Sequence, residues 1–166
     1  SALVRYNALL KFRVLSPEVR TSIAIKHMND SVKMVRIGVA NLILGIDASN
    51  FSETSKIGLN QTLEAYETML YANADFSSGR LQLGDYYLQK NDINNAIKHY
   101  KMALQKDSLL MPVYSNLATS YSLVKDYANA HKTLDQWMLL QPKLGRPHFL
   151  KALLNFETGA NLLAVE

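Results

Sequence analysis

The second half of the chain contains an internal repeat of 34 residues. Sliding the sequence by this distance brings similar residues into register at Leu83/Leu117, Gly84/Ala118, Tyr87/Tyr121, Ala96/Ala130, Tyr100/Leu134, Ala103/Trp137 and Ser108/Pro142. Two antiparallel helices of about a dozen residues and two short turns use up about 34 residues, and each such pair leaves an apolar face that only the next pair covers. The repeat therefore predicts stacked helix pairs.

The turn signals fall at the same spacing. Residues 90–92 (KND) and 124–126 (VKD) stand where each first helix must end and each second helix begin, with Asp or Asn available as caps. Pro142 and Pro147 bracket a break between the second helix pair and a third. The periodicity thus places complete pairs at 77–110 and 111–144, and a partial one at 145–166.

Residues 82–87 (QLGDYY) and 95–104 (NAIKHYKMAL) resemble a tetratricopeptide repeat in residue type and spacing, and residues 116–121 (NLATSY) open a similar unit. The resemblance covers residues 77–166. It implies an all-α fold, a right-handed α-α superhelix of antiparallel helix pairs. Trp137 is large where the pattern is usually small, and we expect a local adjustment of helix packing there.

The front of the chain has another rhythm. Val4-Arg5 recurs as Val35-Arg36. Asp30 stands a few residues before Val35-Arg36, and a segment rich in small residues follows. This pattern resembles HEAT repeats, in which such aspartates and arginines tie neighbouring units together; Asp30, Arg36 and Arg5 are the matching positions. Residues 1–46 are therefore assigned as HEAT-like, and a generic three-helix cap is the alternative.

Between these parts the sequence predicts a polar linker at 47–56 and a helix at 57–76. Leu59, Leu63, Tyr66 and Leu70 mark this helix, which resembles the second half of a tetratricopeptide unit. We expect it to couple the two repeat types into one solenoid by covering the exposed face of the first complete unit.

This order of segments is similar to the C-terminal region of some bacterial proteins whose N-terminal part is a multi-haem c-type cytochrome. The likeness implies a periplasmic home and a redox partner in the same chain, and without it a cytoplasmic home is expected. The chain has no cysteine and hence no haem-attachment motif. Its opening residues already read as helix, so we expect a piece of a longer protein.

The charge is uneven. Residues 1–45 carry seven basic and two acidic residues, a net charge of +5, whereas residues 46–166 carry eleven basic and twelve acidic residues. A basic front could bind nucleic acid or an acidic partner, but its charges are dispersed and no stacking motif accompanies them, so nucleic acid is disfavoured. No apolar run is long enough for a membrane span, and no membrane insertion is expected.

The sequence offers no catalytic equipment. The four histidines (His27, His99, His131 and His148) lack the helical spacing of a metal pair and are interpreted as surface residues. The seven glycines are scattered, so no phosphate-binding loop is expected. The sequence therefore predicts no enzyme activity, no cofactor and no metal.

A groove remains as the candidate site. In tetratricopeptide arrays the first helices of the units line a concave surface that grips peptides or helices. By register that lining would comprise Leu81, Gln82, Asp85, Leu88, Gln89, Ser115, Asn116, Thr119, Ser122, Phe149, Leu153 and Phe156. The carboxylate-clamp version of the groove needs basic residues where this chain has Leu81 and Asp85, so a neutral peptide or an amphipathic helix suits it better.

The main hypothesis is a non-enzymatic protein-binding scaffold that uses this concave face, and the alternative is that the lining residues pack against one another. Two further hypotheses stay open: a docking module of a larger periplasmic cytochrome, and a binder of nucleic acid or an acidic partner through the basic front. Leucines and Phe156 near the end of the chain also predict a homodimer through that end.

Overall fold

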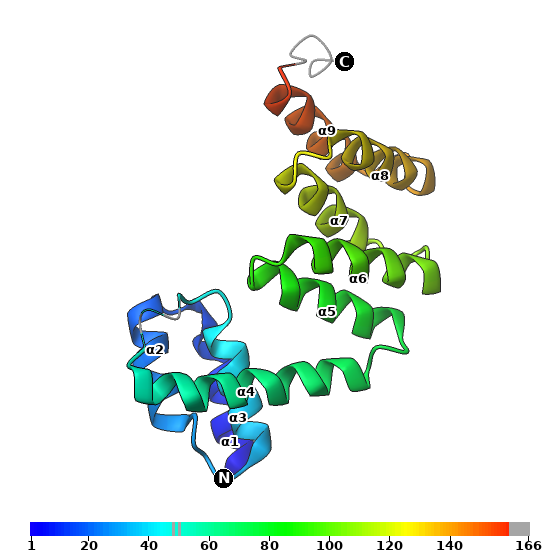
Figure 1. The fold of residues 1–166 in the computed structure, drawn as a ribbon. Helices are drawn as coiled ribbons and strands as arrows, with labels where there is room; N and C mark the ends of the chain where they lie inside the picture. The colour runs from blue at the N-terminus through cyan, green and yellow to red at the C-terminus, as the bar shows by residue number, and fades with distance from the viewer. Residues whose placement is uncertain (48, 50, 160–166) are drawn as a thin grey trace. The chain divides into compact units, whose positions relative to one another are not determined.

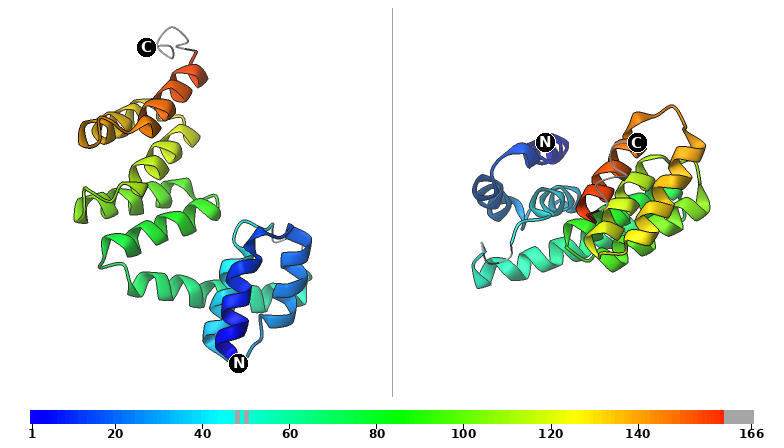
Figure 2. Two further views of the ribbon diagram at one scale, coloured as in Figure 1. Left: turned by 180° about the vertical axis from the view of Figure 1, so that it is seen from behind. Right: turned by 90° about the horizontal axis from the view of Figure 1, so that it is seen from above.

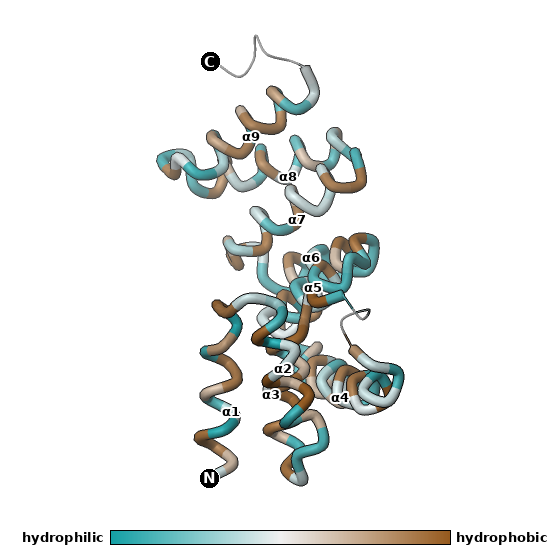
Figure 3. Tube along the Cα trace, turned by 90° about the vertical axis from the view of Figure 1, so that its left-hand side faces the viewer, coloured by the Kyte–Doolittle hydropathy of each residue, from teal (hydrophilic) through white to brown (hydrophobic). Residues whose placement is uncertain are grey.

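The computed structural model describes residues 1–47, 49 and 51–159, and within these ranges it is all-helical, which confirms the predicted fold class (Figure 1). The helices are α1 (Ala2–Lys11), α2 (Pro17–His27), α3 (Lys33–Ile43), α4 (Glu53–Ala72), α5 (Ser77–Gln89), α6 (Ile93–Lys106), α7 (Pro112–Leu123), α8 (Tyr127–Leu140) and α9 (Gly145–Glu157), with a 3-10 turn at Phe12–Val14. Hydrophobic and polar stretches alternate along the helices (Figure 3). None of the described helices is long and apolar enough to cross a membrane.

The chain divides into two compact units, residues 1–72 and 73–166. In the first unit, α3 lies against α1, α2 and α4 and is apolar on most of its surface. The core of the first unit contains Leu9, Ala24, Met28, Val35, Val39, Leu42, Ile43, Phe51 and Leu59. Helix α3 is the central helix of this unit, and six of its eleven residues are buried.

Arginines hold the first unit together where helices end. Arg5 donates from Nε and Nη2 to the two carboxylate oxygens of Asp30, at 2.8 and 3.0 Å, and Arg36 donates to the Asp30 carbonyl at 2.7 Å. The Arg5 hydrogen bonds hold the pKa of Asp30 below its usual value. These are the three side chains that the sequence predicts to be tied together, while the HEAT-like assignment itself stays a prediction.

Arg20 of α2 closes the end of α3. It donates to the carbonyl oxygens of Leu42 and Leu44, which are among the last carbonyls of that helix and lack intrahelical partners. Burial lowers the pKa of Arg20. Arg5, Arg20 and Arg36, three basic residues of the front, are thus engaged in bonds inside the protein.

Helix α4 begins at Glu53, four residues before the predicted helix, and ends at Ala72 rather than at residue 76. The early start has a local cause: Ser52 accepts the backbone N–H of Ser55 at its hydroxyl and that of Lys56 at its carbonyl, as an N-cap does. Residues 48 and 50 of the predicted linker lie outside the described residues. The role of α4 as a coupling helix stays a prediction.

In the second unit, successive helices α5 to α9 lie against one another in antiparallel order (Figures 1 and 2). The 34-residue register is visible in its hydrogen bonds. Asp92 caps α6 by accepting the N–H of Asn95, and Asp126 caps α8 by accepting that of Asn129, both at 3.2 Å. Asn91 and Lys125 precede these caps with positive φ angles of 59° and 60°. The predicted turns and caps are therefore confirmed at both sites.

Where α5 and α6 cross, Gly84 faces the ring of Tyr100. A Cβ atom on Gly84 would collide with that ring, and Tyr100 is fully buried. In the next pair, 34 residues on, Ala118 and Leu134 occupy the corresponding positions in one core cluster. The smaller residue of each pair is thus matched to the larger one, glycine with tyrosine and alanine with leucine.

Trp137 is accommodated inside a continuous α8. Its side chain is buried, and its ring stacks on Tyr114 with 6.3 Å between centroids.

The prediction that His99 is a surface residue is wrong. His99 is 2% exposed and stacks on Tyr87 at 5.3 Å with the rings nearly parallel. Its ring lies on the inner side of α6, where it completes the packing between α5 and α6.

Replacing Gly84 by Ala is expected to lower the free energy of unfolding by about 1–3 kcal/mol, because the added methyl group overpacks the Tyr100 contact. Urea unfolding followed by circular dichroism measures this. Gly145→Ala is the matched control, since a Cβ there meets nothing within 4 Å. Equal stability of the two variants would contradict the assigned role of Gly84.

Candidate protein-binding surfaces

The predicted concave residues lie on three first helices of the second unit: five on α5, four on α7 and three on α9. Helix α7 lies beside both α5 and α9, so these helices share one face, which we call the α5–α7–α9 face. The structure places the residues there but divides them into two groups. One group is engaged in bonds inside the protein, and the other is exposed.

Asp85 and Asn116 belong to the engaged group. The hydroxyl of Tyr100 donates to Asp85 Oδ1 at 2.7 Å, and Asn116 Nδ2 donates to the same oxygen at 2.9 Å. Burial raises the pKa of Asp85, although these two hydrogen bonds act in the opposite direction. Ser115 is buried and accepts a hydrogen bond from Arg146. These three residues are thus engaged in hydrogen bonds inside the protein, while the role of the face in binding stays a prediction.

The exposed group lies on α9. Phe149 and Phe156 are each 67% exposed, and Leu153 between them is 43% exposed. Their spacing of four and three residues places them on one side of the helix. Gln82 and Thr119 are exposed as well, whereas Leu81, Leu88, Gln89 and Ser122 are half-buried. Apolar rings in contact with water on one helix side form a surface that another chain can cover.

A pocket of about 150 Å³ connects α9 to α7. Ala118, Thr119, Leu134 and Leu150 line it, together with Ser122, Leu123, Leu153, Leu154 and Glu157. The first four are the 34-residue equivalents of Gly84, Asp85, Tyr100 and Asn116. In the first pair the hydroxyl of Tyr100 donates a hydrogen bond to Asp85. The second pair has Leu134 and Thr119 at these positions, and a hollow remains.

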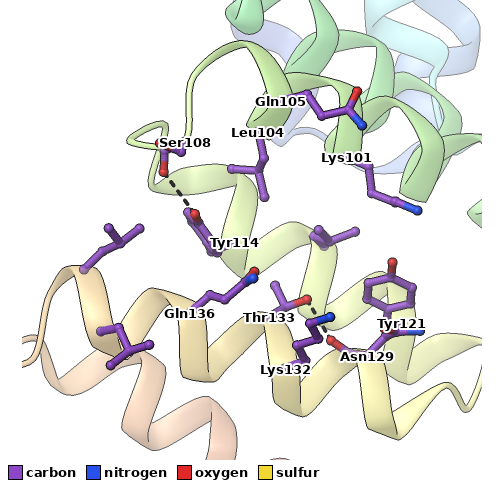
Figure 4. A pocket seen from close by; sticks show the side chains of 13 residues that line it. Lys101, Leu104, Gln105, Ser108, Tyr114, Tyr121, Asn129, Lys132, Thr133 and Gln136 are labelled. Atoms are coloured by element: carbon purple, nitrogen blue, oxygen red, sulfur yellow. Dashed lines mark hydrogen bonds between the residues drawn. The ribbon is translucent and has the colours of Figure 1, made fainter.

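A larger pocket, about 600 Å³, lies on α6, α7 and α8 (Figure 4). Its lining residues are Lys101, Leu104, Gln105, Ser108, Tyr114, Leu117, Tyr121, Asn129, Lys132, Thr133, Gln136, Leu139 and Leu140. We call it the α6–α8 groove. No sequence pattern predicts this groove, because its residues come from three helices and none matches a motif. The available signal was the pair of lysines on the second helices, Lys101 and Lys132, next to exposed leucines.

Neither pocket is lined by a residue of α5 or by a histidine. Among the described residues, no group of three or more His, Cys, Asp or Glu side chains could hold a metal ion. The pockets offer lysines, amides, hydroxyls and leucines, with one carboxylate, Glu157, which accepts a hydrogen bond from Ser122 at 2.9 Å.

Comparisons with known proteins agree on the fold. No protein-family model matches the chain. Stress-induced-phosphoprotein 1 of Caenorhabditis elegans is 27% identical over 85 residues, which are 51% of this chain and 27% of that protein. The chain therefore spans about a quarter of the length of this curated relative. The crystal structure of MamA is similar with a TM-score of 0.55 and 19% identity, over 72% of this chain and 69% of that one.

The fold of the chain is tetratricopeptide-like. This result agrees with the resemblance of residues 77–166 and with the helix pairs of the second unit. The tetratricopeptide-like array described above thus consists of α5 to α9, and residues 160–166 of its predicted third unit lie outside the described residues. The HEAT-like front and the arrangement similar to cytochrome-linked proteins stay predictions.

Asp85→Asn is expected to make the chain more stable than wild type at pH 7. The asparagine keeps an oxygen that accepts from Tyr100 and Asn116 but carries no buried charge. Because the pKa of Asp85 is raised by folding, its ionisation costs stability as pH rises through the folded-state pKa, and this cost is absent below the unfolded-state pKa of about 3.9. Urea unfolding from pH 3 to pH 7 should show the difference in stability between Asp85→Asn and wild type growing with pH.

Proposed function

We propose that this chain is a non-enzymatic scaffold that binds a peptide or a helix of another protein on the α5–α7–α9 face. The observation that carries the proposal is the row of Phe149, Leu153 and Phe156 on α9, which adjoins the pocket between α7 and α9. Covering apolar surface contributes about 25 cal/mol per Å², and aromatic anchors beside a pocket dominate many protein interfaces.

The two tetratricopeptide-like relatives support a scaffold role in general terms. The bonds of Asp85 support a specific form of it. A groove that captures a terminal carboxylate needs cations, but here a carboxylate is bonded to Tyr100 and Asn116 and Leu81 lies one turn before it. The ligand of this face is therefore an apolar peptide or amphipathic helix, anchored toward α9 rather than toward α5.

Replacing Phe149 and Phe156 by Ser is the direct test. Peptides selected from a displayed random library on the wild-type chain should bind this double variant at least about tenfold more weakly, since each anchor contributes more than about 1 kcal/mol. Fluorescence anisotropy measures the affinities. Both residues are exposed, so the unfolding midpoint should stay nearly unchanged.

Ile57→Ser is the matched control for this experiment. Ile57 on α4 is 66% exposed, as much as the two phenylalanines, but it lies in the first unit. Peptide binding should survive this change. Selected peptides that bind the wild type and the Phe149/Phe156 variant equally well would refute the α9-centred site.

The same apolar row is also proposed to support a homodimer at high concentration, because a second copy can cover it. Light scattering should show dimers of the wild type whose fraction rises with concentration, and the Phe149→Ser/Phe156→Ser variant should be a monomer. A wild type that stays monomeric at millimolar concentration contradicts the dimer but leaves peptide binding to be judged by the previous experiment.

A further inference from the structure

The α6–α8 groove is a second surface, separate from the row on α9. Helices α6 and α8 each pack against α7, which forms the floor between them (Figure 4). Leu104, Tyr114 and Leu117 supply apolar floor, and Leu139 at the rim is 83% exposed. Covering so exposed a leucine, together with the apolar hollow beside it, removes apolar surface from water and is therefore favourable.

The groove has two chemically different ends. Because α6 and α8 run in the same direction and α7 runs against them, Lys101, Tyr121 and Lys132 gather at one end, as Figure 4 shows. Tyr114 lies toward the other end, where the last turn of α8 contributes Leu139 and Leu140. One end is thus basic and the other is apolar.

The cations of the basic end are not neutralised. Lys101 and Lys132 form no ion pair or hydrogen bond with any described residue, and none of the lining side chains is a carboxylate. Two carboxylates act on tyrosines of the lining: after burial, Asp126 helps raise the pKa of Tyr121, and Asp107 helps raise that of Tyr114. Asp126 is occupied in capping α8, where Asn129 donates to both of its oxygens.

Several polar side chains of the lining have partners inside the protein, and Asn129 donates to Asp126 at 2.7 Å. The Tyr114 hydroxyl donates to the Ser108 carbonyl at 3.0 Å, and the Thr133 hydroxyl donates to the Asn129 carbonyl at 2.7 Å. Besides the side-chain amides of Gln105 and Gln136, the groove offers a ligand two ammonium groups at one end and leucine surface at the other. The complement of this pattern is an apolar segment that ends in acidic side chains.

We propose that the α6–α8 groove binds an amphipathic α-helix of a partner protein whose apolar stripe is followed by acidic residues. The flanking helices have 14 residues each, so the groove is about 20 Å long at 1.5 Å per residue, which matches a helix of about four turns. A small molecule would stay largely exposed on so open a surface, whereas a helix laid between two helices buries its apolar side.

A second copy of this chain fits the groove poorly. The exposed apolar helix α9 carries Arg146, Lys151, which is paired with Asp135 at 2.6 Å, and Glu157 at its end. Glu157 is the acid that follows the apolar row, but Ser122 of α7 donates to it at 2.9 Å, so it is not available to Lys101 and Lys132 of a second copy. The proposal rests on the proposed function only in treating the chain as a protein-binding scaffold, and it uses different residues.

The test uses two synthetic helices of about four turns, each with a leucine stripe, one ending in two glutamates and the other in two lysines. Anisotropy titrations of the whole chain should show the acidic peptide bound at least about tenfold more tightly than the basic one, with the difference shrinking at high salt. Lys101→Glu/Lys132→Glu should reverse this preference. Leu139→Ser should weaken both peptides.

Two controls separate this groove from the α5–α7–α9 face. Lys98→Glu changes an exposed lysine of α6 that does not line the groove, and it should alter affinity less than about twofold. Phe149→Ser/Phe156→Ser should leave acidic-peptide binding intact. If that variant abolishes it, the peptide binds the α9 row and the groove proposal is wrong.

The remaining outcomes are equally decisive. Equal binding of the acidic and basic peptides, or no effect of Lys101→Glu/Lys132→Glu, overturns the proposal. So does displacement of the peptide by a short single-stranded DNA of higher affinity, which would assign the lysines to phosphate binding. If Lys101→Glu/Lys132→Glu leaves binding of the acidic peptide unchanged while the library-selected peptides also still bind, the proposed function stands and the groove proposal alone fails.

Discussion

The arrangement of the tetratricopeptide-like array depends on one buried side chain, Tyr100. Its ring occupies the space that the missing Cβ of Gly84 leaves open, and its hydroxyl donates to Asp85. Asp85 in turn accepts from Asn116 on α7, so one carboxylate oxygen connects α5, α6 and α7. A buried acceptor that lost these donors would carry its full desolvation cost, and the three helices are therefore held in a single relative position.

The next pair keeps the backbone of this arrangement and changes its chemistry. Ala118, Thr119 and Leu134 replace Gly84, Asp85 and Tyr100, so the second pair has neither the tyrosine hydroxyl that donates nor the carboxylate that accepts. Stacking of Trp137 on Tyr114 fills part of the core instead. The hollow between α7 and α9 is what remains, and it adjoins the exposed phenylalanines. The repeat thus supplies a scaffold, and a departure from the repeat supplies the candidate site.

Periodicity in the sequence was enough to predict the helices, the caps at Asp92 and Asp126 and the first helices that share a face, because these features depend on local spacing. It could not separate Asp85 and Asn116, which bond to each other, from Phe149 and Phe156, which meet water. That distinction depends on Tyr100, a residue of another helix. The prediction that His99 is a surface residue was wrong for the same reason, because its contact with Tyr87 joins two helices and leaves no local pattern. Lys101 and Lys132 each read as an ordinary solvated lysine, and only folding places them at one end of a groove.

Helix α7 lines both proposed surfaces, with Tyr114 and Tyr121 toward the α6–α8 groove and Thr119 and Ser122 toward the pocket on α9. A shared helix is the usual route by which one ligand changes the affinity for another, but it must have two positions of similar free energy. The bond from Asn116 to the buried Asp85 opposes a shift of α7, because movement would leave that carboxylate under-bonded. The two faces of α7 are therefore expected to bind their ligands independently, as fixed surfaces of one rigid helix.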